Sequence, residues 1–151
     1  MELRKFIKTT IRKYLHEQRE IFHTLYHGTD INSAIHIKNN GIDISKSTGG
    51  FFGWGFYTTP KFELAKSNYA DFSDDENDGV VLELELSKNA NVLDLSDSDD
   101  WETWKLYSDK IYNKNLYKEL ISNGIDGLSD NSFDGVVIYN PSVLTLKRII
   151  K

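Results

Sequence analysis

The chain has 151 residues and contains no cysteine, only two prolines and no long apolar run. Without cysteine it has no disulfide, no thiol nucleophile and no thiolate metal site. So few prolines leave little room for a disordered linker. No apolar stretch approaches the roughly 18 residues that span a membrane, and the basic N-terminus lacks the apolar core of a signal peptide. We therefore expect a globular protein with one main domain, located in the cytoplasm.

Motifs of the common nucleotide-binding folds are also absent. The sequence has no Gly-x-Gly-x-x-Gly opening of a Rossmann fold and no Gly-Lys-Ser/Thr phosphate loop. Hydride transfer and ATP hydrolysis are therefore poorly supported. His23 and His27 stand four residues apart, but no third ligand follows at a suitable spacing, so we expect no metal site.

Charge is spread unevenly along the chain, whose formal net charge is −5. Residues 1–20 hold six basic and three acidic side chains, whereas Asp71 to Asp78 and Asp94 to Glu102 carry five carboxylates each. Solvated loops are the simplest interpretation of these acidic clusters, with cation sites and DNA mimicry as alternatives. An acidic chain does not wrap nucleic acid broadly, although a local basic patch can dock RNA, DNA or an anionic partner.

Helical spacing of apolar residues predicts an amphipathic helix over residues 3–18, with a basic opposite face. The apolar positions are Leu3, Phe6, Ile7, Ile11, Tyr14 and Leu15. Such a helix can pack on the rest of the protein, lie on a membrane or bind a partner. We therefore separate a basic helical segment, residues 1–20, from a domain at residues 21–151.

The rest of the chain predicts an α+β protein with a mainly antiparallel sheet. Leu82, Leu84 and Leu86 alternate with Glu83 and Glu85, which is typical of a half-buried strand with its glutamates outward. The pattern predicts strands at 22–27, 80–86, 91–95, 135–140 and 143–150, helices at 30–40, 59–72 and 101–123, and a Gly/Ser/Thr-rich loop at 45–55. Gly41 and Gly124 would end the first and last of these helices, and Thr59 and Pro60 would begin the second.

Two short motifs place polar and aromatic side chains beside glycines at the ends of strand-like segments. They are Tyr26-His27-Gly28-Thr29 and Gly53-Trp54-Gly55-Phe56-Tyr57-Thr58-Thr59. A fold can build a nucleotide pocket in this way, because glycine lets a ligand approach the strand backbone closely.

The order of these motifs resembles the ADP-ribosyltransferase superfamily, in its diphtheria-toxin-like and poly(ADP-ribose)-polymerase-like branch. That family carries His-Gly-Thr or His-Gly-Ser on its first strand and Gly-x-Gly, an apolar residue and Tyr on the next core strand. The segments Gly53 to Tyr69, Val80 to Leu95 and Asp134 to Leu144 are similar to later parts of the family pattern. Phage, plasmid and toxin-system members share the arrangement at Asn123 to Gly127. The resemblance covers residues 22–151 and implies a split β-sheet flanked by helices.

The resemblance implies that NAD+ is the co-substrate, cleaved rather than reduced, without a metal. It assigns His27 to an adenosine-ribose hydroxyl, the backbone of Gly28 to the nicotinamide amide, and Tyr57 and Tyr69 to the nicotinamide ring. Thr29 completes the first motif, and Gly53 and Gly55 let the chain pass close to the dinucleotide.

The third catalytic position departs from the family. A glutamate normally opens the late strand, where this chain has Gly135, with Asp134 one residue earlier. A one-residue offset turns a side chain to the other face unless a bulge corrects it. The resemblance thus implies His27, Tyr57 and Asp134 as catalytic residues, and mono-ADP-ribosylation of a protein or nucleic acid, or NAD+ hydrolysis, rather than poly-chain elongation.

Two alternatives stay open beside this enzyme. One is a catalytically weak module that binds NAD+ or ADP-ribose and recognises a partner, such as an antitoxin, through residues 1–20. The related RNA 2′-phosphotransferases are the other, and the arginine-rich phosphate site that they need is not evident in this sequence.

Overall fold

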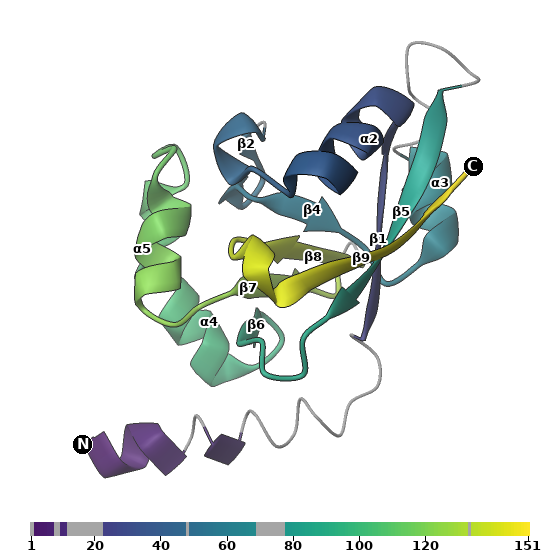
Figure 1. Ribbon diagram of the computed structural model, residues 1–151. Helices are drawn as coiled ribbons and strands as arrows, with labels where there is room; N and C mark the ends of the chain where they lie inside the picture. Colours follow the sequence, from purple (N-terminus) through teal and green to yellow (C-terminus); the bar gives the residue numbers. More distant parts are fainter. Residues whose placement is uncertain (1, 8–9, 12–22, 48, 69–77, 133) are drawn as a thin grey trace.

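Strands and short helices follow one another along the computed structural model, which describes residues 2–7, 10–11, 23–47, 49–68, 78–132 and 134–151 (Figure 1). The strands are β1 (Thr24–Asp30), β2 (Gly49–Gly50), β3 (Gly53–Trp54), β4 (Phe56–Thr58), β5 (Gly79–Leu86), β6 (Val92–Asp94), β7 (Gly127–Asp130), β8 (Gly135–Ile138) and β9 (Leu144–Ile150). The α-helices are α2 (Ile31–Asn40), α3 (Phe62–Asn68), α4 (Ser98–Trp104) and α5 (Leu116–Ser122), and short 3-10 turns lie at Ile44–Lys46, Ser108–Lys110 and Pro141–Val143. The predicted α+β class is confirmed.

Most of the strands form two sheets that adjoin at β1 and β4. The first has the order β1-β5-β9 and is antiparallel. The second has the order β4-β8-β7-β6, in which β6 and β7 are parallel and the other pairs antiparallel. Where the sheets adjoin, Tyr26 and Thr59 exchange backbone hydrogen bonds of 2.8 and 2.9 Å. The sheet is therefore mainly antiparallel, as predicted, and divided into two parts.

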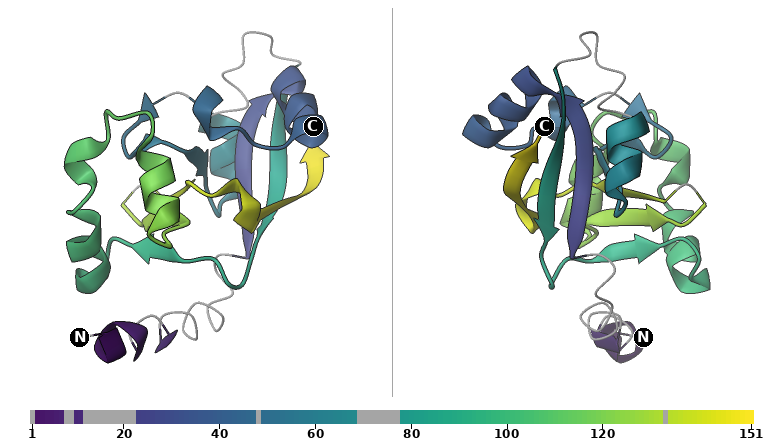
Figure 2. Two further views of the ribbon diagram at one scale, coloured as in Figure 1. Left: turned by 60° about the vertical axis from the view of Figure 1, so that its left-hand side comes forward. Right: turned by 90° about the vertical axis from the view of Figure 1, so that its right-hand side faces the viewer.

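Helices cover the sheets on both faces (Figure 2). Leu82, Leu84 and Leu86 of β5 are buried in the core that also contains Ala34 of α2, which confirms the predicted inward face. On the opposite face, Ala65 of α3 packs with Val81. The helices α4 and α5 pack on the second sheet through a separate cluster of aromatic and leucine side chains.

The predicted helix at 101–123 is wrong, because the chain forms two short helices with a turn between them. The carboxylate of Asp97 accepts hydrogen bonds from the backbone N–H groups of Asp99 and Asp100, so α4 starts earlier, at Ser98. The side chain of Asn113 accepts from the N–H of Asn115, which turns the chain before α5. The strand β7 was not predicted at all; it pairs with β6 and β8 in the interior of the second sheet.

Other boundaries shift by a few residues. Strand β1 runs to Asp30 instead of residue 27, and α3 starts at Phe62, although the Thr59 hydroxyl accepts from the N–H of Lys61 as a local cap. The predicted loop at 45–55 contains the small β2–β3 hairpin. Gly41 ends α2 with φ +82°, as predicted.

The acidic cluster from Asp94 to Glu102 is only partly a solvated loop. Asp100 is buried, and its carboxylate accepts a hydrogen bond of 2.8 Å from the N–H of Asp94. Asp97 caps α4, so two of the acids hold local structure. Of the other cluster, only Asp78 lies within the described residues.

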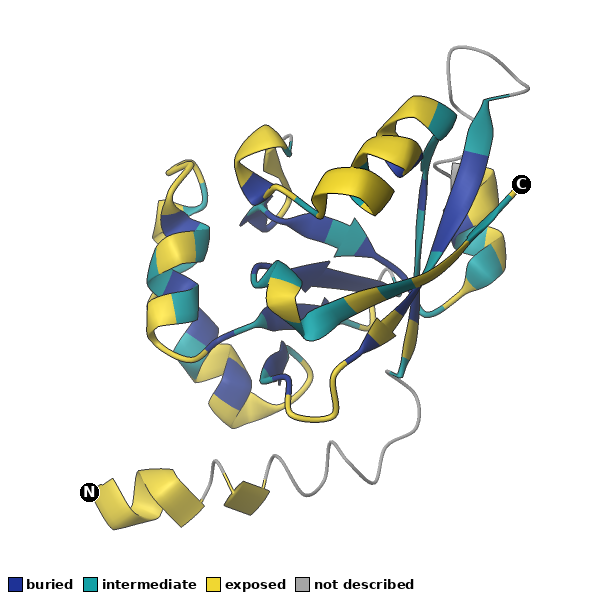
Figure 3. Cartoon of the chain, viewed as in Figure 1, coloured by how far each residue is buried: buried dark blue, intermediate teal, exposed yellow. Residues whose placement is uncertain are grey.

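Residues 2–7 and 10–11 are helical, in agreement with the start of the predicted amphipathic helix. Their apolar side chains at Leu3, Phe6, Ile7 and Ile11 are exposed, as Figure 3 shows for this segment. Tyr14 and Leu15 lie outside the described residues. Within the described part of the chain, we find no helix with the length and apolar character needed to cross a membrane.

Candidate functional site

A cavity of about 610 Å³ lies beside the place where the two sheets adjoin. One wall comes from β1 and α2, and its lining residues are His27, Thr29, Ser33, His36 and Ile37. Across the cavity, the opposite wall comes from the segment between Gly50 and Tyr57, and its lining residues are Gly50, Gly55, Phe56 and Tyr57. The turn from Gly41 to Ser47, which carries Asp43 and Lys46, completes the rim. The cavity thus combines apolar side chains, glycine backbone and a few polar groups, which is the usual make-up of a small-molecule site.

The two sequence motifs meet at His27. Its Nδ1–H donates a hydrogen bond of 2.6 Å to the backbone carbonyl of Tyr57, and its ring stacks on Phe56 with centroids 4.1 Å apart. Because a carbonyl can only accept, this bond fixes the proton on Nδ1 and leaves Nε2 as an acceptor. Burial lowers the pKa of His27, and the bond to Tyr57 only partly opposes this effect. The imidazole is therefore neutral and oriented at pH 7.

The first wall is built by regular structure. Thr24–Asp30 pairs with β5 along its whole length, with His27 opposite Leu82 and Gly28 opposite Val81. The strand ends at Asp30, whose carboxylate caps α2 by accepting from the N–H and the hydroxyl of Ser33, both at 2.8 Å. Strand register and a helix cap thus position every residue of this wall.

The second wall is held by tyrosine hydroxyls. The hydroxyl of Tyr57 accepts from the N–H of Phe52 at 3.0 Å and donates to the carbonyl of Gly53 at 2.8 Å. The buried hydroxyl of Tyr139 donates to the carbonyl of Phe52 at 2.9 Å, and burial raises the pKa of Tyr139 well above its usual value. The segment 49–55, which we call the glycine loop, is therefore anchored from two sides.

Close packing explains why glycines form this loop. Gly53 has φ +83°, a conformation that favours glycine. A Cβ atom on Gly55 would lie 2.5 Å from Cγ1 of Val137, and one on Gly50 would overlap the ring of Tyr57. The backbone of the loop thus lies directly on Tyr57 and on the core of the second sheet.

Four of the residues expected to bind NAD+ line the cavity together. They are His27, Thr29, Gly55 and Tyr57. Gly28 lies between two of them on β1 and is buried, while Gly53 contributes the loop conformation. Tyr69 lies outside the described residues. The two motifs are therefore brought to one place, by the short β1–β4 contact and by the bond from His27.

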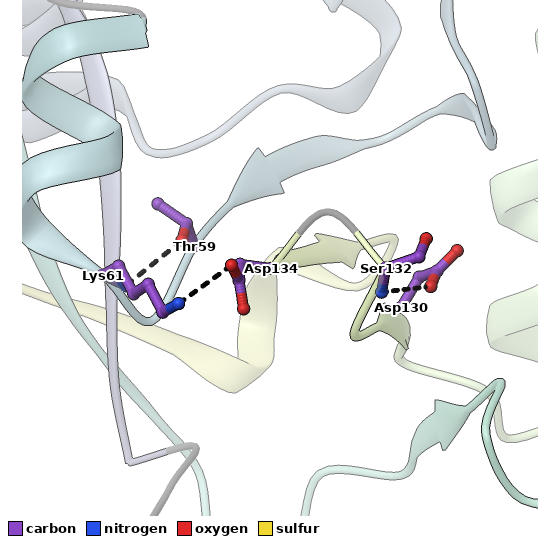
Figure 4. A network of polar contacts seen from close by, with 5 residues as sticks. All are labelled: Thr59, Lys61, Asp130, Ser132 and Asp134. Atoms are coloured by element: carbon purple, nitrogen blue, oxygen red, sulfur yellow. Dashed lines mark hydrogen bonds and ion pairs between the residues drawn. The ribbon is translucent and has the colours of Figure 1, made fainter.

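Asp134 lies apart from these residues, in the turn that precedes β8 (Figure 4). It has φ +53°, and its carboxylate forms an ion pair of 2.9 Å with Nζ of Lys61. It is not among the residues that line the cavity. Gly135, the position where the resemblance would place a glutamate, starts β8 opposite Asp130. The carboxylate that does line the cavity is Asp43, and the side chain and N–H of Ser45 lower its pKa by hydrogen bonding.

Sequence reasoning did not identify His36, Lys46 or Tyr139 as parts of the site. His36 and Lys46 are exposed residues of α2 and the following turn, and nothing in their spacing distinguishes them from other surface side chains. Tyr139 follows a run of apolar residues in a late strand, where a core role is the default. Its contact with Phe52 spans 87 positions, so no local pattern could reveal it.

No group of three or more His, Cys, Asp or Glu side chains lies close enough to hold a metal ion within the described ranges. No family model matches the chain, and no curated protein matches its sequence.

Proposed function

We propose that the protein is a mono-ADP-ribosyltransferase that binds NAD+ in the cavity and transfers one ADP-ribose to a macromolecule, with release of nicotinamide. The observation that carries the proposal is the hydrogen bond from His27 to the carbonyl of Tyr57, because it joins the two motifs on which the family resemblance rests. A divided sheet flanked by helices, as the resemblance implies, also supports it. The cavity volume of about 610 Å³ falls within the range of about 300–1,000 Å³ that is common for small-molecule sites.

The reaction breaks the bond between C1′ of the ribose and the ring nitrogen of nicotinamide. Nicotinamide leaves with the bonding electrons as a neutral molecule, an acceptor atom bonds to C1′, and the proton of the acceptor passes to solvent. The protein has to hold the sugar and the leaving ring in a reactive arrangement. Neutral His27 suits the binding of the other end of NAD+, because its Nε2 can accept a hydrogen bond from a hydroxyl of the adenosine ribose while Nδ1 keeps the imidazole in place.

The second wall suits the leaving ring. Tyr57 supplies an aromatic surface, and aromatic contact with a flat ring contributes on the order of 1–3 kcal/mol. Its hydroxyl is bonded to the glycine loop, so we assign the ring to ligand contact and the hydroxyl to loop anchoring. Gly28 offers its backbone N–H and C=O groups beside His27 for the amide of nicotinamide.

Asp134 is our candidate for the acid that stabilises positive charge on the ribose. Its place outside the cavity lining and its ion pair with Lys61 favour a second candidate function, in which the protein binds NAD+ or ADP-ribose without turning it over. The two functions differ in one measurable quantity, the release of nicotinamide.

The purified chain should release nicotinamide from NAD+, and RNA, DNA or protein should accept radiolabelled ADP-ribose. Asp134→Asn should then lower turnover by about a hundredfold or more, the usual effect of removing a preorganised charged group. Asparagine tolerates positive φ, so this change removes the charge and keeps the turn. Lys61→Met breaks the same ion pair but keeps the carboxylate, and Glu85→Gln removes a carboxylate on the outward face of β5; both should retain activity. Binding of NAD+ without any nicotinamide release would establish the binding module instead.

A further inference from the structure

Two aromatic side chains, one of them next in sequence to a residue that lines the cavity, are almost fully exposed. The exposed fraction is 84% for Phe51 and 87% for Tyr112, higher than for any other large apolar residue in the described part of the chain. Phe51 directly follows Gly50, which lines the cavity. The neighbouring Phe52 is buried, whereas Phe51 faces solvent.

The segments that carry these two residues touch each other. A Cβ atom on Gly53 of the glycine loop would lie 3.1 Å from the carbonyl oxygen of Ile111, the residue before Tyr112. Figure 1 shows the loop at β2–β3 beside the turn that leads into α5. The segments that carry Phe51 and Tyr112 are therefore in contact, and we call these two residues together the aromatic rim, which adjoins the cavity at Gly50.

The aromatic rim is held in place although its side chains are exposed. Phe51 contacts Phe52 edge to face at 5.6 Å, and Phe52 contacts Trp104 in the same way at 6.0 Å. The backbone N–H and C=O of Phe52 are bonded to the hydroxyls of Tyr57 and Tyr139. The Phe51 side of the rim is thus preorganised, which reduces the entropy lost when a ligand stacks on it.

The charges around the rim favour an anionic ligand. Residues 109–119 contain three lysines and two carboxylates, Asp109 and Glu119, which gives this segment a net charge of +1 in a chain whose formal net charge is −5. Lys110 is bonded to Glu119, whereas Lys114 and Lys118 form no ion pair with any described residue. Lys46 stands on the rim of the cavity as a further cation.

We propose that the aromatic rim binds single-stranded nucleic acid, with bases stacked on Phe51 and Tyr112 and phosphates near Lys114 and Lys118. Exposed aromatic rings among basic side chains are the usual means of binding single strands with little sequence preference. The exposed amides of Asn113 and Asn115 can hydrogen-bond the edges of unpaired bases. As the acceptor of ADP-ribose, such a strand would enter the cavity past the glycine loop; this assignment rests on the proposed function, whereas binding to the rim does not.

Fluorescence anisotropy of the full chain with labelled 12-nucleotide single-stranded RNA and DNA tests the proposal. We expect the affinity to fall as the salt concentration is raised. Binding releases cations that are condensed on the phosphates, and added salt makes this release less favourable. The double variant Phe51→Ser/Tyr112→Ser should bind at least tenfold more weakly, and Lys114→Gln/Lys118→Gln should bind more weakly with a smaller salt dependence. Leu106→Ser removes a side chain that is 69% exposed and lies outside the rim, so it should bind as the wild type does.

Equal binding by the aromatic double variant, or no binding of either single strand, would overturn the proposal. Salt-sensitive binding to phosphatidylglycerol vesicles or to an acidic peptide, without binding to nucleic acid, would also overturn it and assign the rim to that partner. Nicotinamide release, measured in the same samples, separates this proposal from the proposed function. Binding of single-stranded nucleic acid without nicotinamide release would contradict the proposed enzyme activity but support the nucleic-acid surface. The Tyr112→Ser variant should release nicotinamide from NAD+ alone at the wild-type rate.

Discussion

The two walls of the cavity are built by different forces. The β1–α2 wall is part of a regular strand and a capped helix, and the ladder with β5 fixes where each side chain lies. The glycine loop has little regular structure, and the hydroxyls of Tyr57 and Tyr139 and close packing on Val137 hold it. The shape of the β1–α2 wall should therefore tolerate single substitutions outside its core. The shape of the glycine loop should depend on a few side-chain contacts. Substitutions that affect one wall and spare the other test this difference.

The largest expected effect is on the packing of the glycine loop. Gly55→Ala places a methyl group against buried Val137 and should lower the free energy of unfolding by about 2 kcal/mol, as other overpacked cores do. Denaturant titration monitored by tryptophan fluorescence measures the change. Val137→Ala in the same chain makes room for the new methyl group, so the double variant should lose less than the sum of the two single losses. Additive losses would show that the loop does not press on Val137.

The next effect concerns the anchor from the second sheet. Tyr139→Phe removes the bond to the carbonyl of Phe52 and leaves that carbonyl without its donor in a buried place. We expect a loss of about 1.5 kcal/mol in the free energy of unfolding and faster hydrogen exchange at Phe52 and Gly53. Tyr112→Phe removes an exposed hydroxyl and serves as the control. If both variants unfold at the same denaturant concentration, the hydroxyl of Tyr139 does not hold the loop.

On the first wall, His27→Ala should lower NAD+ turnover at least tenfold, which equals about 1.4 kcal/mol of transition-state binding. The strand ladder is made by the backbone, so the fold should remain intact, as circular dichroism can verify. His23→Ala removes a histidine that does not line the cavity and should leave turnover unchanged. A folded His27→Ala protein with full turnover would remove the NAD+ assignment.

A smaller effect separates the ring of Tyr57 from its hydroxyl. Tyr57→Phe keeps the ring but removes the hydroxyl that anchors the glycine loop. KM for NAD+ should therefore rise about fivefold, which corresponds to about 1 kcal/mol, the net free energy of a typical hydrogen bond, while kcat changes less. Tyr57→Ala removes both and should lower turnover at least tenfold. Steady-state kinetics with varied NAD+ gives both constants. A Tyr57→Phe enzyme with a normal KM would assign the loop's position to packing alone.

The smallest effect is a change of stability with pH. Burial lowers the pKa of His27 from its usual 6.5, so the unfolded chain binds the proton more tightly than the folded one. As the pH falls below about 6.5, the unfolded state gains protons first and the free energy of unfolding decreases. The decrease between pH 7 and pH 5 should be smaller in His27→Gln than in the wild type. An identical pH profile in both proteins would mean that His27 titrates as it does in water.

The sequence predicted the first wall better than the second. The alternation at Leu82 to Leu86 and the stop at Gly41 are local signals, and the structure confirms both. The glycine loop was expected as a loop, but its anchors leave no periodic pattern in the sequence. The hydroxyl of Tyr57 bonds a residue 4 positions away, and the hydroxyl of Tyr139 bonds a residue 87 positions away.

The same reason explains the error at 101–123. Apolar spacing alone does not show that Asn113 will bond to the following backbone and break the helix in two. For the site, the short motifs named His27 and Tyr57, and in the structure both residues line one cavity and share a hydrogen bond. Asp134 was placed by counting along a strand, and its ion pair with Lys61 could not be anticipated because the two residues are 73 positions apart.

The contact between Tyr26 and Thr59 couples ligand binding in the cavity to the association of the two sheets. Two backbone hydrogen bonds join one sheet to the other at this point, and the bond from His27 to Tyr57 adds a third link, one residue from Tyr26 on the first strand and two residues from Thr59 on the second. A ligand that contacts both His27 and Tyr57 touches both sheets where they adjoin and links them. Its binding free energy is then added to the cohesion of the two sheets. Backbone hydrogen exchange at Tyr26 and Thr59 should therefore slow when the cavity is occupied.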